Sequence, residues 1–294
     1  DPIGSRGLGD VYKRQDQVSA DAILVSGKRK MDEILPKLED LLDNDSAEIR
    51  TSAAAAIIDM DSGSIDKATN ILDEALQSSD ELTKSNALKR LEINEDILPD
   101  TKLEIFLKEE NILTSNAALL VAEKRKRESL LPAIITNLGN SKTFLQARQA
   151  LQSFDEETVI ENFTNILSNS DLGRHKRRGI IKALKDYPAS NLLLDQLDET
   201  DQGIYNETVD SLLVRARAEE LDEKRLEIIS SEIQKVARKL YALHVCKKLL
   251  PENDKKLLII DHLNNEIQNA LPSLLKLGVM SKPKMCRIGG GGPG

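Results

Sequence analysis

The sequence predicts an all-α protein, an α-solenoid of about six stacked helical hairpins with a helical C-terminal cap. Three observations predict this fold. Aromatic residues make up only 3% of the chain, with no Trp, and this composition suits helix-on-helix packing rather than β-sandwiches or barrels. Apolar residues recur with helical spacing. Finally, a unit of apolar helix, short polar break and second apolar helix repeats about every 30 residues.

The repeated unit is clearest between Ser129 and Tyr187, where two consecutive copies can be aligned. In each copy, the apolar residues of a helix fall on one helical face. In the leading helices, the apolar residues of the first copy match those of the second: Leu130, Leu131, Ile134, Ile135 and Leu138 with Val159, Ile160, Phe163, Ile166 and Leu167. The following helices match in the same way: Phe144, Ala147, Ala150, Leu151 and Phe154 with Ile180, Ile181, Ala183, Leu184 and Tyr187. Because one small hairpin cannot bury both of its faces, we expect each copy to stack on neighbours of the same kind.

The same plan extends to both sides of this pair. Further units run through residues 31–60, 65–91, 97–122 and 191–213, each with a polar break between its two helices. In the first unit, the break DNDS supplies a loop and an N-cap for the second helix. The last Leu of each first helix follows spacings of 34, 31, 31, 29 and 30 residues, at Leu42, Leu76, Leu107, Leu138, Leu167 and Leu197. This period, held over the six units, is the strongest signal in the sequence.

One turn carries a family resemblance. In LLDNDSAEIRTSAAAAI, an acidic residue precedes a β-branched residue and Arg, and small residues follow inside the second helix; these are Asp45, Ile49, Arg50, Ala53 and Ala54. The stretch resembles the HEAT repeat, of armadillo type, especially its short bacterial form of about 30 residues. In two other units Thr83 and Gln146 stand near the place of the Arg. The resemblance covers residues 31–217.

The repeats divide the chain into five segments. Beyond the array, the apolar spacing predicts one long helix through Leu226–Leu243 that ends near Pro251, and then a helical pair over Lys255–Ile267 and Ala270–Leu277. SRGLGDVYKRQ near the start resembles a translated sequencing adaptor, and the closing GGGGPG has the low complexity of a linker, a scar or a frameshift. We therefore expect the natural protein to extend beyond both ends. The expected segments are an adaptor artefact at 1–15, a weakly patterned lead-in at 16–30, the HEAT-like array at 31–217, the helical cap at 218–280 and a disordered or artefactual tail at 281–294.

The order of the segments carries a second resemblance. Repeats that end in SLLVRAR, followed by a long helix and a hairpin, are similar to the cytosolic HEAT segment of bacterial carrier fusions of the ADP/ATP-exchange or major-facilitator kind. This resemblance implies the cytosolic regulatory part of a larger membrane protein. No run approaches the roughly 18 apolar residues that cross a bilayer, and Cys246 and Cys286 show no disulfide spacing. We therefore expect a cytoplasmic chain, attached to a membrane only through a missing segment.

Two basic clusters are the candidate binding residues. KRKR closes a helix, where the helix dipole favours cations, and RHKRR opens one, where the dipole opposes them. Two explanations stay open for the second cluster: pairing with acidic residues of the adjacent turn, or an anion- or partner-binding patch. The candidate residues are Lys124, Arg125, Arg127, Arg174, Lys176, Arg177 and Arg178.

The sequence predicts a non-catalytic scaffold that binds a protein partner on the surface formed by its second helices. We predict no catalytic or cofactor-binding site, because the sequence has no nucleophile elbow, phosphate loop or His-Glu pairing. We predict no metal site, because His175, His244 and His262 have no partners at ligand spacing. The net charge of −8 argues against general affinity for nucleic acid. Two alternatives remain: a HEAT-like enzyme of the DNA glycosylase or bilin lyase type, and an anion or nucleic-acid adaptor that uses the basic clusters.

Overall fold

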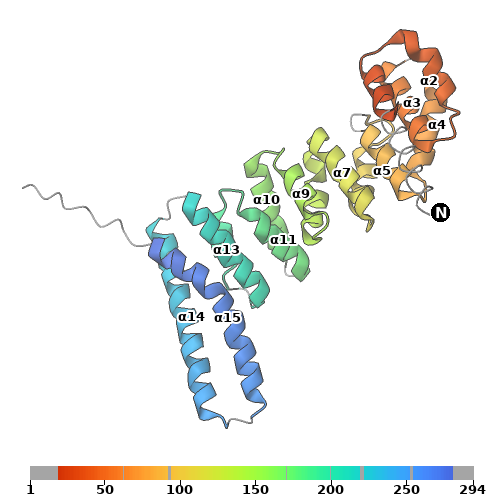
Figure 1. The fold of residues 1–294 in the computed structure, drawn as a ribbon. Coiled ribbons are helices and arrows are strands. Elements are labelled where there is room, and N and C mark those ends of the chain that lie inside the picture. Colours follow the sequence, from red (N-terminus) through yellow and green to blue (C-terminus); the bar gives the residue numbers. More distant parts are fainter. Residues whose placement is uncertain are drawn as a thin grey trace, which may run out of the picture. The chain divides into compact units, whose positions relative to one another are not determined.

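The computed structural model describes residues 19–61, 63–91, 94–169, 171–198, 200–218, 222–251 and 254–280. The expected adaptor at 1–15 and the expected tail at 281–294 lie outside the described residues. Within the described residues the secondary structure is helical and contains no strand, and neighbouring helices pack against one another. This confirms the prediction of an all-α helical repeat fold (Figure 1).

The chain forms two compact units, Asp1–Val159 and Ile160–Gly294. In the first unit, residues 19–28 of the lead-in are helical. They are followed by η1 (Asp32–Ile34), α2 (Leu35–Leu41), α3 (Ala47–Met60), α4 (Ile65–Leu76), α5 (Glu81–Arg90), α6 (Asp100–Leu107), α7 (Ile112–Arg125), η2 (Glu128–Leu130), α8 (Leu131–Thr136), η3 (Asn137–Gly139) and α9 (Phe144–Leu151).

Side-chain caps explain where two of the second helices begin. The carboxylate of Asp80 accepts a hydrogen bond from the backbone amide of Thr83, and the side chain of Asn111 accepts from the amides of Leu113 and Thr114. Each cap satisfies amides that have no partner within the helix itself. The polar breaks seen in the sequence are therefore helix starts as well as loops.

The second unit contains longer helices. Its elements are α10 (Glu156–Leu167, which begins in the first unit), α11 (Arg174–Leu184), α12 (Ser190–Leu194), α13 (Gln202–Ala218), α14 (Glu223–Leu249) and α15 (Lys256–Met280). The sequence predicted a helical pair after Pro251, but the structure has the single helix α15, with Pro272 inside it. The polar residues around Gln268 do not end the helix, because Ala270, Leu274 and Leu277 beyond them are buried.

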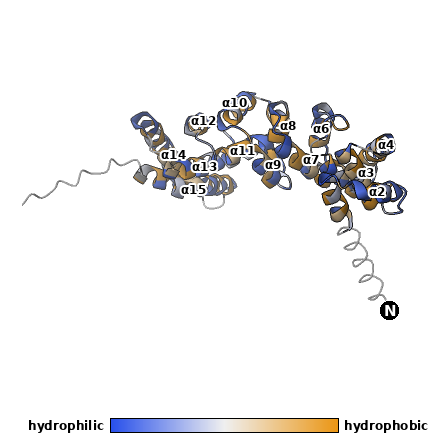
Figure 2. Cartoon of the chain, turned by 90° about the horizontal axis from the view of Figure 1, so that it is seen from above, coloured by the Kyte–Doolittle hydropathy of each residue, from blue (hydrophilic) through white to orange (hydrophobic). Residues whose placement is uncertain are grey.

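The leucines that define the period lie in the core. Leu42, Leu76, Leu107, Leu138, Leu167 and Leu197 are each no more than 6% exposed. Helices α4, α10 and α11 are amphipathic, with a hydrophobic and a hydrophilic face (Figure 2), whereas α3 is buried on all sides from Thr51 to Ile57. Small residues allow an especially close approach near the start of the chain, where a Cβ on Gly27 would lie 2.5 Å from the Cα of Ala56 in α3. The lead-in helix therefore packs directly on the alanine run of α3.

Polar contacts between successive hairpins follow the same period. In the first unit, the Asn137 amide donates to the carbonyl oxygen of Leu107, 30 residues earlier, at 2.8 Å. In the second unit, the Ser211 hydroxyl donates to the carbonyl oxygen of Ile181, also 30 residues earlier, at 3.1 Å. Both bonds are buried, so they fix the register between neighbouring hairpins in addition to the apolar packing. None of the described helices has both the length and the apolarity that a membrane span requires.

Candidate partner-binding surface

Arg125, in the first basic cluster, is a buried structural residue. Its side chain is 2% exposed. Its guanidinium donates to the carbonyl oxygens of Leu91, Asn94 and Leu98 at 2.6 to 3.1 Å and lies 3.3 Å from the carboxylate of Asp100. Five N–H donors in a planar fork suit this task, which a Lys could not perform. Arg125 thus holds the loop between α5 and α6 against the end of α7.

The rest of the first cluster is exposed. Arg127 pairs with Glu95 at 2.6 Å. This bond lowers the pKa of the Glu95 carboxyl, because a hydrogen bond from the cation stabilises the charged form. Lys124 is exposed and has no ion pair among the described residues. Of the three candidate residues in this cluster, Lys124 is therefore the one whose charge is available at the surface.

The second cluster is also largely occupied by contacts within its own unit. Arg174 lies 2.7 Å from the carboxylate of Asp201, and Arg178 lies 3.2 Å from that of Glu207. Both acidic residues belong to the next hairpin, at α13 or the turn before it. Of the two explanations that the sequence left open for this cluster, these contacts favour pairing between repeats. Lys176 is exposed, and no ion pair of its side chain occurs among the described residues.

Arg177 belongs to a position that recurs in the second helices. It is the fourth residue of α11 and donates to the carbonyl oxygens of Leu167 and Asn169, which lie at the end of α10 and in the turn before α11. Arg50, the fourth residue of α3, donates in the same way to Asn44 and Asp45. The hydroxyl of Ser115, the fourth residue of α7, donates to the carbonyl oxygen of Glu109. In each of these hairpins, the fourth residue of the second helix thus holds the turn between the two helices in place.

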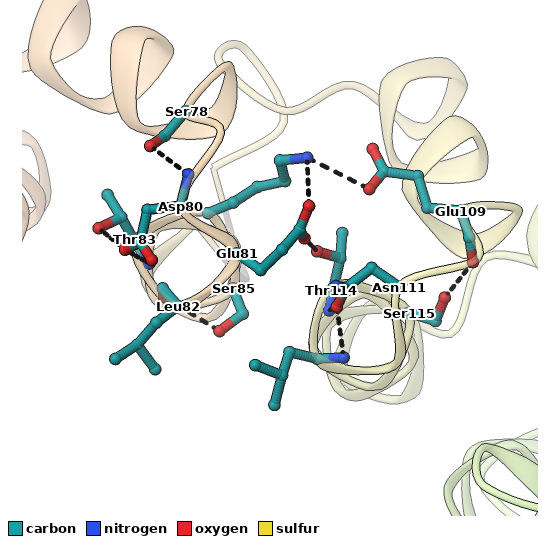
Figure 3. A network of polar contacts seen from close by, with 12 residues as sticks. Ser78, Asp80, Glu81, Leu82, Thr83, Ser85, Glu109, Asn111, Thr114 and Ser115 are labelled. Atoms are coloured by element: carbon teal, nitrogen blue, oxygen red, sulfur yellow. Dashed lines mark hydrogen bonds and ion pairs between the residues drawn. The ribbon is translucent and has the colours of Figure 1, made fainter.

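Lys84 occupies this position in α5, one residue after Thr83, which the sequence had placed near it. Its ammonium lies 3.3 Å from the carboxylate of Glu109 and 3.4 Å from that of Glu81 (Figure 3). Glu81 in turn accepts a hydrogen bond from Thr114 of the next hairpin. Burial lowers the pKa of the Lys84 amine, but the two carboxylates outweigh it and the net pKa is raised. Side chains of opposite charge therefore join the two hairpins.

A polar hollow in the second unit was not foreseen from the sequence. It has a volume of about 230 Å³ and lies between the turn before α13 and helices α13, α14 and α15. Glu232 on its wall is 5% exposed, and its two oxygens accept from the hydroxyl of Tyr205 at 3.0 Å and the ammonium of Lys235 at 3.1 Å. Lys235 also bonds to Asp198 at 2.8 Å. These bonds fasten α14 to the last hairpin of the array.

The protonation of this group follows from its surroundings. Burial raises the pKa of the Tyr205 hydroxyl, and the negative charge of Glu232 and the bond donated to it raise it further. The bond to Asp198 raises the pKa of the Lys235 amine. A sequence signal did exist: Glu232 comes three residues after Ile229 and four before Val236, so it falls on the same helical face as these apolar residues. An acidic residue at such a place needs buried donors.

The hairpin of α14 and α15 carries a concentration of exposed large apolar residues. They are Ile228, Tyr241, Leu249, Leu258, Ile259, Leu263, Leu275 and Val279. In the first unit, Leu82 and Leu113 are exposed at the second residue of α5 and α7. Among the described residues, no group of three or more His, Cys, Asp and Glu side chains is placed to hold a metal ion.

Comparisons with known proteins add little to this picture. No family model matches the chain, and no curated protein matches it. Among solved structures, the chain is similar to the crystal structure of an engineered protein from the Northeast Structural Genomics Consortium, with 16% sequence identity and a TM-score of 0.23. That match covers 83% of this chain and 97% of the other.

Proposed function

We propose that this chain is a non-catalytic scaffold of HEAT-like repeats that binds a protein partner on its helical surface. The observation that supports this most is the use made of its polar side chains. Arg125 and Arg177 are committed to contacts inside the repeats, and Glu232 of α14 is committed to a contact with the last repeat. The exposed side chains include lysines such as Lys124 and Lys176 and aliphatic residues on helix faces. Such surfaces bind other proteins by shape and charge.

Selection from a displayed peptide library tests this function. The purified full chain serves as bait, and urea-unfolded chain removes peptides that bind any exposed apolar segment. We expect enriched peptides that bind the folded chain saturably with one-to-one stoichiometry and compete for a small number of surfaces. The variants Lys124→Glu and Lys176→Glu reverse the charge of the two unpaired lysines. If they abolish peptide binding, the basic clusters are the binding surface. Failure to enrich any peptide on a chain that circular dichroism shows to be folded contradicts the scaffold.

The resemblance to carrier fusions supports a wider proposal, that the scaffold is the cytosolic regulatory part of a larger membrane protein. Long-read sequencing of the source DNA tests it by recovering the gene with its true flanks. We expect membrane-spanning helices to be encoded upstream. A start codon near Met31 and a stop codon soon after Leu277 would contradict this wider proposal and leave a free-standing scaffold.

A further inference from the structure

A single apolar stripe runs the length of α15. Its residues are separated by steps of four, four, three, four and three, at Ile259, Leu263, Ile267, Ala270, Leu274 and Leu277. Alternating steps of three and four keep side chains on one face and are the spacing by which one helix packs along another. The stripe is therefore suited to contact a helix over its whole length.

Only the C-terminal half of this stripe is covered. Ala270, Leu274 and Leu277 are at most 1% exposed, and α15 packs on α13 and α14. Toward the N-terminus, Leu263 is 41% and Ile259 is 61% exposed. The cause is helix length, since α13 has 17 residues whereas α15 has 25 and α14 has 27. Figure 1 shows this hairpin extending past the end of α13 within the unit.

The uncovered half is bordered by cations. Lys239 of α14 lines the hollow together with Ile267 of the stripe, and Lys256 precedes Ile259 by about one helical turn. Both lysines are exposed. On α14, Lys235 pairs with Asp198 and Glu232, and Lys247 pairs with Asp261 of α15. Beyond Lys235, the cations of this helix that are exposed and have no ion pair among the described residues are Arg238, Lys239 and Lys248. Acidic groups beside the exposed stripe would therefore be attracted to this part of the hairpin.

We propose that the uncovered half of the stripe binds an acidic amphipathic helix of a partner protein, which takes the place that a continuation of α13 would occupy. This inference rests on the proposed scaffold function and names its partner class. The buried half of the same stripe lies on α15 where that helix packs on α13 and α14, so a helix suits the uncovered half as well. A second copy of this hairpin would bring like charges together, which is unfavourable.

A designed peptide tests this proposal. The probe is a fluorescein-labelled helix of about three heptads with Leu at positions a and d and Glu at e and g, where like charges oppose its self-association. A control peptide carries Lys at e and g. Fluorescence anisotropy with the full chain is expected to show saturable binding of the Glu peptide. The Lys peptide should bind at least tenfold more weakly, a difference in binding free energy of about 1.4 kcal/mol or more.

Variants of the hairpin locate the binding. We expect the double variant Ile259→Glu, Leu263→Glu to weaken binding of the Glu peptide at least tenfold. Both side chains are exposed, so circular dichroism should show an unchanged fold. The matched control is Leu258→Glu, because Leu258 is 75% exposed and adjacent to Ile259 but lies outside the stripe. The charge reversal Lys239→Glu, Lys256→Glu should shift the preference toward the Lys peptide.

Several outcomes would overturn the proposal. Equal binding of both peptides, or binding that survives Ile259→Glu, Leu263→Glu, excludes the stripe as an acidic-helix site. A dimer in sedimentation that this double variant dissociates assigns the stripe to a second copy. Binding to phosphatidylserine vesicles that the variant abolishes, without peptide binding, assigns it to a membrane. If library peptides bind elsewhere on the chain and the Glu peptide does not bind, the scaffold function stands while this inference fails.

Discussion

At the residue scale, one residue of a charged cluster can be buried while its neighbours are exposed. Arg125 lies in the run KRKR, yet its side chain is buried and serves backbone carbonyl groups. A buried carbonyl that loses its donor costs free energy, because it also cannot bond to water. The role of Arg125 therefore depends on a loop some 30 residues earlier in the chain, which no local pattern indicates.

Substituting Arg125 tests this role. Arg125→Met keeps much of the side-chain length but removes every donor to Leu91, Asn94 and Leu98. We expect the free energy of unfolding to fall by about 3 kcal/mol. Urea unfolding followed by circular dichroism measures it. The control is Lys124→Met, at the exposed neighbouring position, which should change stability by less than about 0.5 kcal/mol. Equal effects of the two substitutions would contradict a structural role for Arg125.

The hydrogen bond between Tyr205 and Glu232 should make the stability of the chain depend on pH in the alkaline range. The pKa of Tyr205 is raised above its ordinary value of 10.0 in the folded chain. Its contribution to stability is therefore complete below pH 10 and is lost as pH rises toward the folded pKa, because the unfolded chain ionises first. Tyr205→Phe should cost about 1.5–3 kcal/mol at neutral pH, the value of a bond to a charged group.

The pH dependence separates this bond from simple packing. The stability difference between the wild-type chain and Tyr205→Phe should shrink as urea titrations are taken above pH 10. Tyr241→Phe, at a largely exposed tyrosine on α14, should change stability at neutral pH by less than about 0.5 kcal/mol. A difference for Tyr205→Phe that stays constant across the alkaline range would show that its hydroxyl bond does not couple to folding.

At the element scale, the period of the leucines was enough to place most helices. The unit predicted from residue 65 begins with α4. Three leucines predicted as the last Leu of their first helices are the last residues of α4, α6 and α10, at Leu76, Leu107 and Leu167. Periodicity succeeds where a helix buries one face, as α4 does with Ala68, Leu72, Ala75 and Leu76, and where a polar break separates it from the next helix. It failed after Pro251, where polar residues near Gln268 suggested a break that packing on α13 and α14 overrides.

The candidate surface was harder to predict than the helices. The basic clusters were found because charge is visible in sequence, but partners such as Asp201 and Glu207 for the second cluster come from the next hairpin. To predict which part of α15 is exposed, one must know that α13 is shorter than α14 and α15. Ile259 and Leu274 look alike in the pattern, and only the end of α13 makes one exposed and the other buried. Apolar spacing shows which face of a helix is hydrophobic, but it does not show whether another helix packs on that face.

The first helix of the chain supplies a prediction at the same scale. Residues 19–28 approach α3 so closely that a Cβ on Gly27 would lie 2.5 Å from the backbone of Ala56. Gly27→Val should therefore displace this helix from the alanine run of α3. We expect faster hydrogen–deuterium exchange and proteolysis across residues 19–30. Gly173→Ala is the control, because a Cβ there meets nothing within 4 Å. Unchanged protection in Gly27→Val would show that the close packing is unimportant.

At the scale of the whole molecule, the chain consists of two compact units of stacked hairpins. In a repeat protein each hairpin contacts mainly its neighbours, so stability is close to a sum of local terms. The hydrogen bonds from Asn137 to Leu107 and from Ser211 to Ile181 agree with this description, because each joins a hairpin to the one before it. A local defect should accordingly loosen its own unit before it affects the other.

Two core substitutions, one per unit, test this independence. Arg125→Met removes the buried donor of the first unit, and Phe163→Ala removes a fully buried ring of the second, which stacks edge-on against Tyr187 with ring centroids 5.6 Å apart. Phe163→Ala should cost about 3–5 kcal/mol. Hydrogen–deuterium exchange read by mass spectrometry should show lost protection in α6 and α7 for the first variant and in α11 and α13 for the second. If either substitution lowers protection equally in all these helices, the two units unfold as one, and the nearest-neighbour description of this chain fails.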